Sequence, residues 1–339
     1  MLYSAVFGIV SAMVGAGFAS GREIMHFFSR FGPLSWALVM LAALFTCALI
    51  SCLMETETAA PNGKTGRIVK ICLLPLFAAA GGAMTAAAGE LVALTVPLLY
   101  ARFVGGLLTL CAGVVIARKP IVLLGVIGKI LVPLLLLAFF FCLRLPVEPA
   151  AKRSVPETYP LIALIQLVGY CGLNVTLSAG VIREAGQNCI SGEKKKISLY
   201  TGIMIGLLLC AGNAALLPHA DAQQHAALPV VTLLRNYGKV GFYLCAGVLY
   251  LAVLSTLAAI LRTMRGLFPP RVEHSILWAG LLCAVSSLLG FEEIVGLAYP
   301  ALGWLGILLI FGRKFLKRGT VFRFASSIGR RPNKEEGNR

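Results

Sequence analysis

Residues 15–28 read GAGFASGREIMHFF and lie within the first apolar segment of the chain. Three glycines fall within residues 15–21, and Arg22 and Glu23 follow them at once. Glycine weakens the interior of a helix, and charged side chains are costly inside a bilayer. An interrupted helix exposes backbone N–H and C=O groups that lipid cannot satisfy. We therefore predict that this segment faces protein, water or a bound solute.

The composition around this segment is that of a membrane protein. Hydrophobic residues make up 58% of the chain and charged residues only 13%, whereas soluble domains are about half apolar and about a quarter charged. Apolar runs long enough to cross a bilayer recur along the chain. The pattern predicts an all-α polytopic membrane protein whose first span is retained, since no signal-peptide cleavage site follows it. The ten predicted spans are 3–28, 33–54, 67–95, 98–117, 120–143, 160–184, 197–217, 238–262, 274–290 and 293–312.

The distribution of Lys and Arg predicts how these spans are oriented. Basic residues in the even-numbered connections and in the tail outnumber those on the opposite side by roughly three to one, as the positive-inside rule requires if both termini are cytoplasmic. We expect a multi-pass protein of the plasma membrane. The net charge of +16 reflects this bias, so we expect the basic tail to contact anionic lipid and not nucleic acid.

The spans divide into two halves of five, which must run in opposite directions across the membrane. This predicts a first repeat at 1–143, an extracytoplasmic connection at 144–159, a second inverted repeat at 160–312 and a cytoplasmic tail at 313–339. The sixth span contains GYCGLNVTLSAG at 169–180, and sliding one half on the other brings Gly17 opposite Asn174. Matched interruptions at mid-membrane indicate a transporter binding site. The alternative is that these glycines only permit close helix packing.

The stretch GAGFASGREIMHFFSRFGP at 15–33 resembles the N-terminal signature of the YkvI-type membrane proteins. These are regarded as permeases related to the amino acid–polyamine–organocation transporters. The resemblance implies ten transmembrane helices in a LeuT-like five-plus-five inverted repeat, with helices 1 and 6 broken.

In LeuT-like transporters the carboxylate and amine of the substrate lie at these two breaks. By position, the resemblance places the carboxylate at the backbone of residues 19–21. It places the amine at the carbonyls of residues 15–16 and in the region around Asn174. Phe18, Tyr170 and Leu173 would line an apolar pocket. The predicted substrate-binding residues are Gly15, Ala16, Gly17, Phe18, Ala19, Ser20, Gly21, Tyr170 and Asn174.

The predicted substrate is an amino acid or a similar small organic solute. The breaks themselves contain no acidic residue, which disfavours polyamines and other strongly cationic substrates. Arg22 and Glu23, directly after the first break, are predicted to form a pair that is structural or acts as a gate.

Two alternatives remain for the coupling ion. Sodium-coupled relatives use a carbonyl of span 8 and two adjacent hydroxyls three residues further on, and Ala252, Ser255 and Thr256 match that spacing. Hard oxygen ligands suit sodium, although such hydroxyls also bond to their own helix. Lys129 in span 5 resembles the lysine that replaces this ion in some proton-coupled relatives. Its alternative is to extend its amine to the cytoplasmic interface.

The leading functional prediction is a secondary active transporter that works by alternating access with sodium or protons. The alternative is a membrane nutrient receptor of the same fold that binds its ligand without transport. A metal-ion transporter of the superfamily is disfavoured, because GAGFASG and GLNVTLS replace the acidic-Pro-Gly motif of span 1 and the methionine of span 6. No nucleophile with His and acid partners is found, so we expect no enzyme activity, no catalytic residue, no resident metal and no organic cofactor. His219 and His225 are expected to lie in a solvated loop.

Overall fold

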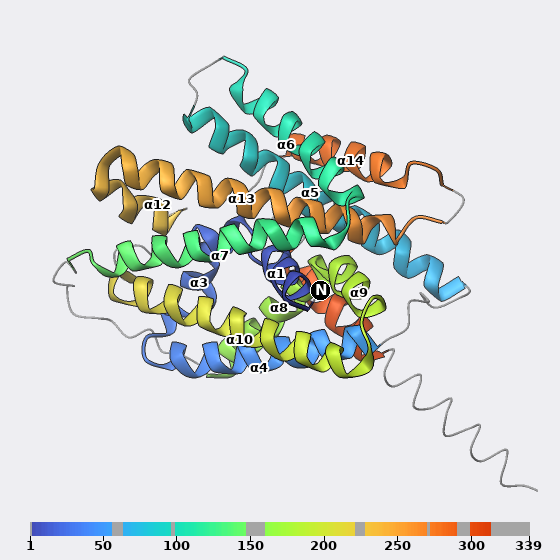
Figure 1. Cartoon of the computed structure of the whole chain (residues 1–339), viewed down its shortest axis with the longest axis horizontal. Helices are drawn as coiled ribbons and strands as arrows, with labels where there is room; N and C mark the ends of the chain where they lie inside the picture. Colours follow the sequence, from blue (N-terminus) through green and yellow to red (C-terminus); the bar gives the residue numbers. More distant parts are fainter. Residues whose placement is uncertain are drawn as a thin grey trace, which may run out of the picture.

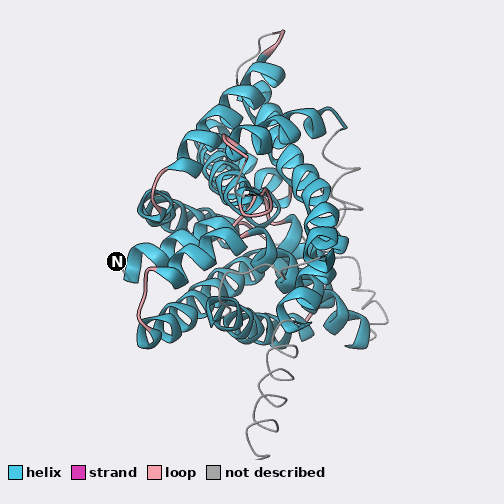
Figure 2. Ribbon diagram, turned by 90° about the vertical axis from the view of Figure 1, so that its right-hand side faces the viewer, coloured by secondary structure: helices cyan, strands magenta, loops and turns pink. Residues whose placement is uncertain are grey.

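The computed structural model describes residues 2–55, 64–95, 99–146, 160–220, 228–269, 272–289 and 299–312. Within these ranges the chain is helical, with only turns and short connections between the helices (Figure 2). The predicted tail at 313–339, nearly all of the predicted connection at 144–159, and His225 lie outside the described residues.

The helices fall on either side of the gap at 147–159. Those before it are α1 (Leu2–Met13), α2 (Ala16–Ala19), α3 (Arg22–Phe27), η1 (Ser29–Phe31), α4 (Leu34–Glu55), α5 (Lys64–Thr95), α6 (Ala101–Arg118) and α7 (Ile121–Leu143). Those after it are α8 (Pro160–Leu177), α9 (Ala179–Gln187), α10 (Ser191–Leu216), η2 (Leu217–His219), α12 (Pro229–Leu234), η3 (Arg235–Tyr237), α13 (Gly238–Arg265), α14 (Ser275–Ser286) and η4 (Ser287–Leu289). A last apolar helix covers Tyr299–Gly312.

Seven helices in the described part of the chain are long and apolar enough to cross a membrane. They coincide with predicted spans 2 to 8. Shorter apolar helices, α1, α14 and Tyr299–Gly312, lie where spans 1, 9 and 10 were predicted. The prediction of an all-α polytopic membrane protein is confirmed. It succeeded because a helix must have a minimum apolar length to cross a bilayer, and that length can be read from the sequence.

Helix α1 lies at the centre of the molecule, in contact with α7, α10 and α13 (Figure 1). Its contact with α7 depends on two glycines of α7. A Cβ added to Gly125 would lie 3.0 Å from the Cα of Ser4, and one added to Gly128 would lie 2.8 Å from the carbonyl carbon of Phe7. Any larger residue would push the two helices apart, so these glycines fix the distance between α1 and α7.

The other helices form two groups around this centre. Helices α5, α6 and α14 pack on one another and on α13, whereas α4 and α10 pack together with α8 and α1 (Figure 1). Helix α13 contacts both α1 and the group of α5, α6 and α14. It therefore connects the two parts of the fold.

Candidate functional site

The first span is interrupted, as the sequence predicted. Helix α1 ends at Met13, Val14 and Gly15 are not helical, and the single turn of α2 follows. The chain then turns at Gly21, whose φ of +80° is in the left-handed region that favours glycine. A Cβ at this position would also lie 2.7 Å from Leu216 and 2.9 Å from Val230. We refer to residues 14–21 as the first-span break.

The carbonyl groups around the end of α1 are bound by two hydroxyls of α13. Ser255 donates a hydrogen bond to the carbonyl oxygen of Ser11 at 2.7 Å. Thr256 donates to the carbonyl oxygens of Ala12 at 3.2 Å and Val14 at 3.3 Å. The structure thus brings the two predicted hydroxyls to the first-span break, and both side chains are buried.

The alternative that these hydroxyls bond to their own helix is true in part. Ser255 also lies 3.0 Å from the carbonyl oxygen of Ala252, so that oxygen belongs to the same cluster. The cluster contains only neutral oxygen atoms, which are the ligands that hard monovalent cations accept. We call these groups the α13 oxygen cluster; they are the hydroxyls of Ser255 and Thr256 and the carbonyls of Ser11, Ala12, Val14 and Ala252.

Lys129 is not part of this cluster in the described contacts. It lies on the exposed face of α7 together with Val126 and Ile130. The neighbouring Gly128 belongs to the opposite, buried face that packs on α1. This position fits the alternative in which the lysine stem lies along the lipid and its amine extends toward an interface.

The sixth span differs from the prediction. Helix α8 continues through Asn174 to Leu177, and the interruption is the single residue Ser178 before α9 begins. The side-chain amide of Asn174 donates to the carbonyl oxygen of Tyr170 at 3.1 Å, within the same helix. The break is therefore later and narrower than the sequence suggested, and Asn174 is a buried helical residue.

Close packing explains why the glycines of this span do not open the helix. A Cβ on Gly172 would lie 2.6 Å from Ile307, and one on Gly303 would lie 3.3 Å from the carbonyl carbon of Gly169. These glycines bring α8 against the helix Tyr299–Gly312. The alternative of close packing therefore holds for Gly169 and Gly172, whereas the glycines of the first span form a true break.

Backbone groups at the interruption around Ser178 are also hydrogen-bonded by a side chain of α13. The backbone N–H of Gly180 donates to the hydroxyl of Thr263 at 2.9 Å, and that hydroxyl lies 3.0 Å from the carbonyl oxygen of Leu177. Helix α13 thus provides hydroxyls to both interruptions, two turns apart along its length. Thr263 was not identified from the sequence, because nothing there places it beside the sixth span.

The predicted pair of Arg22 and Glu23 is not formed: among the described ion pairs none joins them. Instead, the side chain of Glu23 turns back over α2. A Cβ added to Gly17 would overlap the carboxylate of Glu23 and lie 2.8 Å from its Cδ. Oxygen Oε2 of this carboxylate is buried and has no hydrogen-bond partner. The reason for the difference is that Gly17, without a side chain, leaves room for the carboxylate against the main chain.

Aromatic side chains of α8 pack on those that follow Glu23 in the chain. The ring of Tyr170 packs on Phe27 and Phe28, with ring centroids 5.1 and 5.2 Å apart. Tyr170 therefore packs on the segment that follows the first-span break, and its role in substrate binding stays a prediction.

A cavity of about 170 Å³ adjoins the first-span break. Since one water molecule occupies about 30 Å³, it has room for a small solute. Glu90 at its edge forms an ion pair with Arg102, 2.6 Å apart and exposed to solvent. Phe18 lies in the packed core and does not line this cavity. The lining residues are Ala16, Gly17, Ser20, Arg22, Ala87, Glu90, Leu91, Leu94, Leu228 and Leu249.

The end of the break that carries Gly21 is covered by α12. The backbone N–H of Val230 donates to the carbonyl oxygen of Ser20 at 2.9 Å. Leu228, just before α12, lines the cavity. By the predicted orientation this is the extracytoplasmic side, so α12 closes the break from outside.

A partly buried ion pair joins the helices at the opposite end, on the side predicted to be cytoplasmic. Arg262 of α13 pairs with Glu184 of α9 and also donates to the carbonyl oxygens of Lys119 and Ile116. Glu184 in turn accepts from the backbone N–H of Ile121 at 3.2 Å. We call this set of contacts the α9–α13 latch. Glu184 was missed in the sequence because its partner is 78 residues away.

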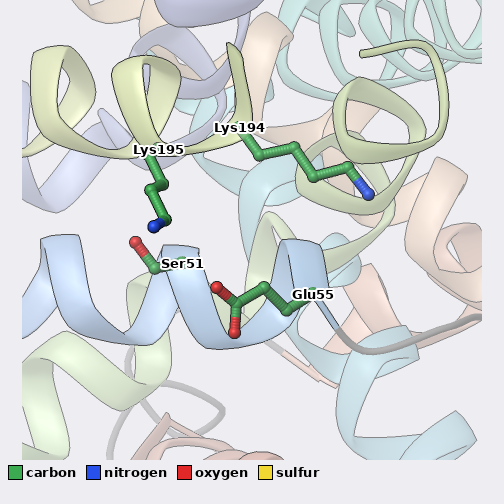
Figure 3. Close-up of a pocket in the computed structure, with 4 residues that line it drawn as sticks. All are labelled: Ser51, Glu55, Lys194 and Lys195. Carbon is green, nitrogen blue, oxygen red and sulfur yellow. The ribbon is translucent and has the colours of Figure 1, made fainter. Parts of the chain in front are cut away.

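A second cavity, of about 200 Å³, lies between α4 and α10. It is lined by Ser51, Glu55, Lys194 and Lys195. Figure 3 shows the side chain of Lys195 directed toward Ser51. The side chain of Lys194 points away from Ser51 and Lys195. This cavity is remote in sequence from both interruptions and shares no lining residue with the cavity at the break. In the described part of the chain no three residues of the His, Cys, Asp and Glu types come together.

Comparisons with known proteins agree with this architecture. No protein-family model matches the chain. It is 23% identical over 331 residues to the uncharacterized membrane protein YkvI of Bacillus subtilis (strain 168), covering 90% of this chain and 92% of that protein. The two are similar along nearly their whole length.

Among solved structures the chain is similar to a manganese transporter of Eremococcus coleocola. The transporter bound to an aromatic bis-isothiourea substituted compound superposes with a TM-score of 0.59 at 14% identity, covering 90% of this chain and 74% of the other. A mutant of that transporter gives a TM-score of 0.58. The two proteins share a fold. At this identity the likeness carries no information about the substrate.

Proposed function

We propose that the chain is a secondary active transporter of small organic solutes, amino acids in particular, built as a LeuT-like inverted repeat of ten helices. One observation carries the proposal: the hydroxyls of Ser255 and Thr256 lie on the carbonyls at the first-span break. Backbone carbonyls and paired hydroxyls at the midpoint of an interrupted helix are the features with which such transporters hold an ion beside the substrate. The fold shared with a known transporter supports the same conclusion.

Alternating access needs one closure on each side of the binding site. The hydrogen bond of Val230 with Ser20 provides the outer closure, and the ion pair of Glu184 with Arg262 provides the inner one. Both contacts are made in this structure. Opening one while the other holds would expose the first-span break to one side at a time.

Sodium is the coupling ion that the geometry favours. The α13 oxygen cluster gathers hard oxygens from two helices, whereas Lys129 lies on the exposed face of α7. A proton remains the alternative. In that case the hydroxyls of the cluster serve only to satisfy the carbonyls of α1.

An organic solute fits the surroundings of the break better than a metal ion does. The cavity is lined mainly by alanine and leucine, with polar groups contributed by Ser20, Arg22 and Glu90. Among the described residues, one carboxylate, that of Glu23, lies against the main chain of the break. Apolar walls with a few polar groups suit small zwitterions.

The test is uptake of a radiolabelled amino-acid mixture into proteoliposomes that contain the purified chain. An imposed sodium gradient and an imposed pH gradient are compared, with protein-free vesicles as the blank. Accumulation driven by sodium, and lost in Thr256→Val, supports the proposal. The matched control is Thr85→Val, because Thr85 is also buried but bonds only to Gly81 of its own helix. Binding of amino acids without accumulation under either gradient would favour the receptor alternative.

A further inference from the structure

The carboxylate of Glu23 occupies a specific place at the first-span break. It belongs to α3 but lies against Gly17 of α2, so close that a Cβ on Gly17 would overlap it. Gly17 itself is one of the residues that line the cavity at the break. Glu23 is not itself a lining residue, so its carboxylate lies directly behind Gly17, a residue of the cavity wall that has no side chain.

Among the residues that the structure describes, this carboxylate has no cationic partner. Oxygen Oε2 is buried without a hydrogen bond, and neither of the described ion pairs includes Glu23. The adjacent Arg22 lines the cavity but does not form an ion pair with Glu23. Burying an unpaired carboxylate opposes folding unless a partner binds to it. Its position is explained if the partner is a ligand.

The surroundings of the carboxylate suit an ammonium group. The ring of Tyr170 packs on Phe27 and Phe28, which follow Glu23 closely in the chain. Aromatic faces attract cations, and an ammonium donates three hydrogen bonds to carboxylate, phenol and carbonyl oxygens. An anionic ligand would be repelled by the carboxylate.

We propose that Glu23 is the residue that binds the ammonium group of the substrate, which defines the substrate class as small solutes with a primary amine. The inference rests on the proposed transport function, since it assigns a partner to the same site. The sequence suggested that no acidic group lies at the breaks and that cationic substrates are therefore disfavoured. The position of Glu23 changes that expectation. Amines that lack a carboxylate belong to the class, whereas carboxylic acids that lack an amine do not.

The first experiment measures ligand binding by the purified full-length chain in detergent, through the shift of its thermal unfolding. Three matched mixtures are the probes: the standard amino acids, the primary amines derived from them by loss of the carboxylate, and the carboxylic acids derived by loss of the amine. We expect stabilisation by the amino acids and by the amines, and none by the acids. Equal stabilisation by the acids, or none by any mixture, would overturn the inference.

Variants then locate the amine contact. Glu23→Gln keeps the size of the side chain and should weaken amine binding by about tenfold or more, as loss of a hydrogen bond to a charged group does. Glu90→Gln is the matched control, because Glu90 lines the cavity at the break but its carboxylate is exposed and paired with Arg102. Gly17→Ala keeps the carboxylate but displaces it, so it should also weaken the binding of amines. Unchanged amine affinity in a folded Glu23→Gln protein contradicts the proposal.

The proteoliposome assay separates this inference from the proposed function. Gradient-driven uptake that Glu23→Gln leaves unchanged would disprove the role of Glu23 while transport stands. Amine binding that depends on Glu23, without uptake under either gradient, would disprove transport while the site stands. The Glu23→Gln protein could also lose uptake driven by a pH gradient while it binds amines with unchanged affinity. That result would mean that the carboxylate carries a proton, and it would overturn the inference.

Discussion

The hydroxyl oxygen of Ser255 lies 2.7 Å from the carbonyl oxygen of Ser11. The two residues are 244 positions apart, and the contact joins the middle of α13 to the last turn of α1. Thr256 extends it to Ala12 and Val14. An interrupted helix is stable here because side chains of another helix satisfy its free carbonyls.

Replacing these hydroxyls should affect ion coupling more than folding. Ser255→Ala and Thr256→Val each remove hydrogen bonds that contribute about 1 kcal/mol apiece to the free energy of unfolding. We expect both variants to fold and to lose sodium-driven uptake by at least about tenfold, measured as initial rates at saturating solute. Thr85→Val should retain the wild-type rate. Normal sodium dependence in both variants would exclude the α13 oxygen cluster as the ion site.

Lys129 offers the complementary test. Because it lies on the exposed face of α7, Lys129→Gln should change neither the sodium dependence nor the initial rate of uptake. The measurement is uptake under separate sodium and pH gradients. A selective loss of pH-driven uptake in this variant would instead identify the lysine as the proton carrier.

Loss of the α9–α13 latch should open the protein on one side. The side chain of Arg262 is only 6% exposed, whereas that of Glu184 is 34% exposed, so removing one partner should lower the free energy of unfolding by about 2 kcal/mol. Glu184→Gln should also raise the labelling of cysteines introduced along the first-span break by membrane-impermeant thiol reagents applied from the cytoplasmic side. Arg262→Lys, which keeps the charge but loses the fork of donors, should show an intermediate effect. Unchanged labelling in Glu184→Gln would show that the latch does not control access.

The turn at Gly21 can be tested against a glycine with an ordinary helical backbone. Gly21→Ala places a Cβ against Leu216 and Val230 and should cost about 1–2 kcal/mol from the left-handed backbone alone. Gly247 in α13 has open space around it and no positive φ, so Gly247→Ala meets neither the clash nor the backbone cost. We expect a lower thermal unfolding temperature for Gly21→Ala than for Gly247→Ala. Equal temperatures would mean that neither the turn at Gly21 nor its contact with α12 excludes a side chain.

Helix packing provides a test of the fold itself. Gly128→Val should separate α7 from α1 and lower stability by several times the effect of Gly247→Val, since no atom lies within 4 Å of a Cβ at Gly247. The readout is the yield of monodisperse protein in detergent and its unfolding temperature. Similar behaviour of the two variants would contradict the close contact of α1 with α7.

Much of the fold was predictable because the bilayer imposes a length on apolar segments. The described helices begin and end within a few residues of most predicted spans, and the break at Gly15–Gly21 was predicted from its glycines and charges. The sixth span was misjudged because glycine has two uses in membranes. Gly172 permits contact with Gly303, which resembles a break in sequence but keeps the helix intact.

The contacts that were missed depend on side-chain direction or on distant partners. Glu23 follows Arg22 directly, which suggested a pair, but neighbours in a helix point away from each other. Only the structure shows that its carboxylate turns toward Gly17. Likewise the partners Glu184 and Arg262, and Thr263 with Gly180, meet only once α9 lies on α13.

The hydroxyls of Ser255 and Thr256 bear on how an ion would be bound and released in the proposed transport cycle. A hydroxyl rotates about a single bond and changes from donor to acceptor without moving its helix. Donating, these groups satisfy the carbonyls of α1; turned away, they present lone pairs to a cation that the same carbonyls also bind. In the proposed transport cycle, the ion-bound and ion-free forms of the α13 oxygen cluster would then differ by two bond rotations, and the cluster would exchange its ion without displacing either helix.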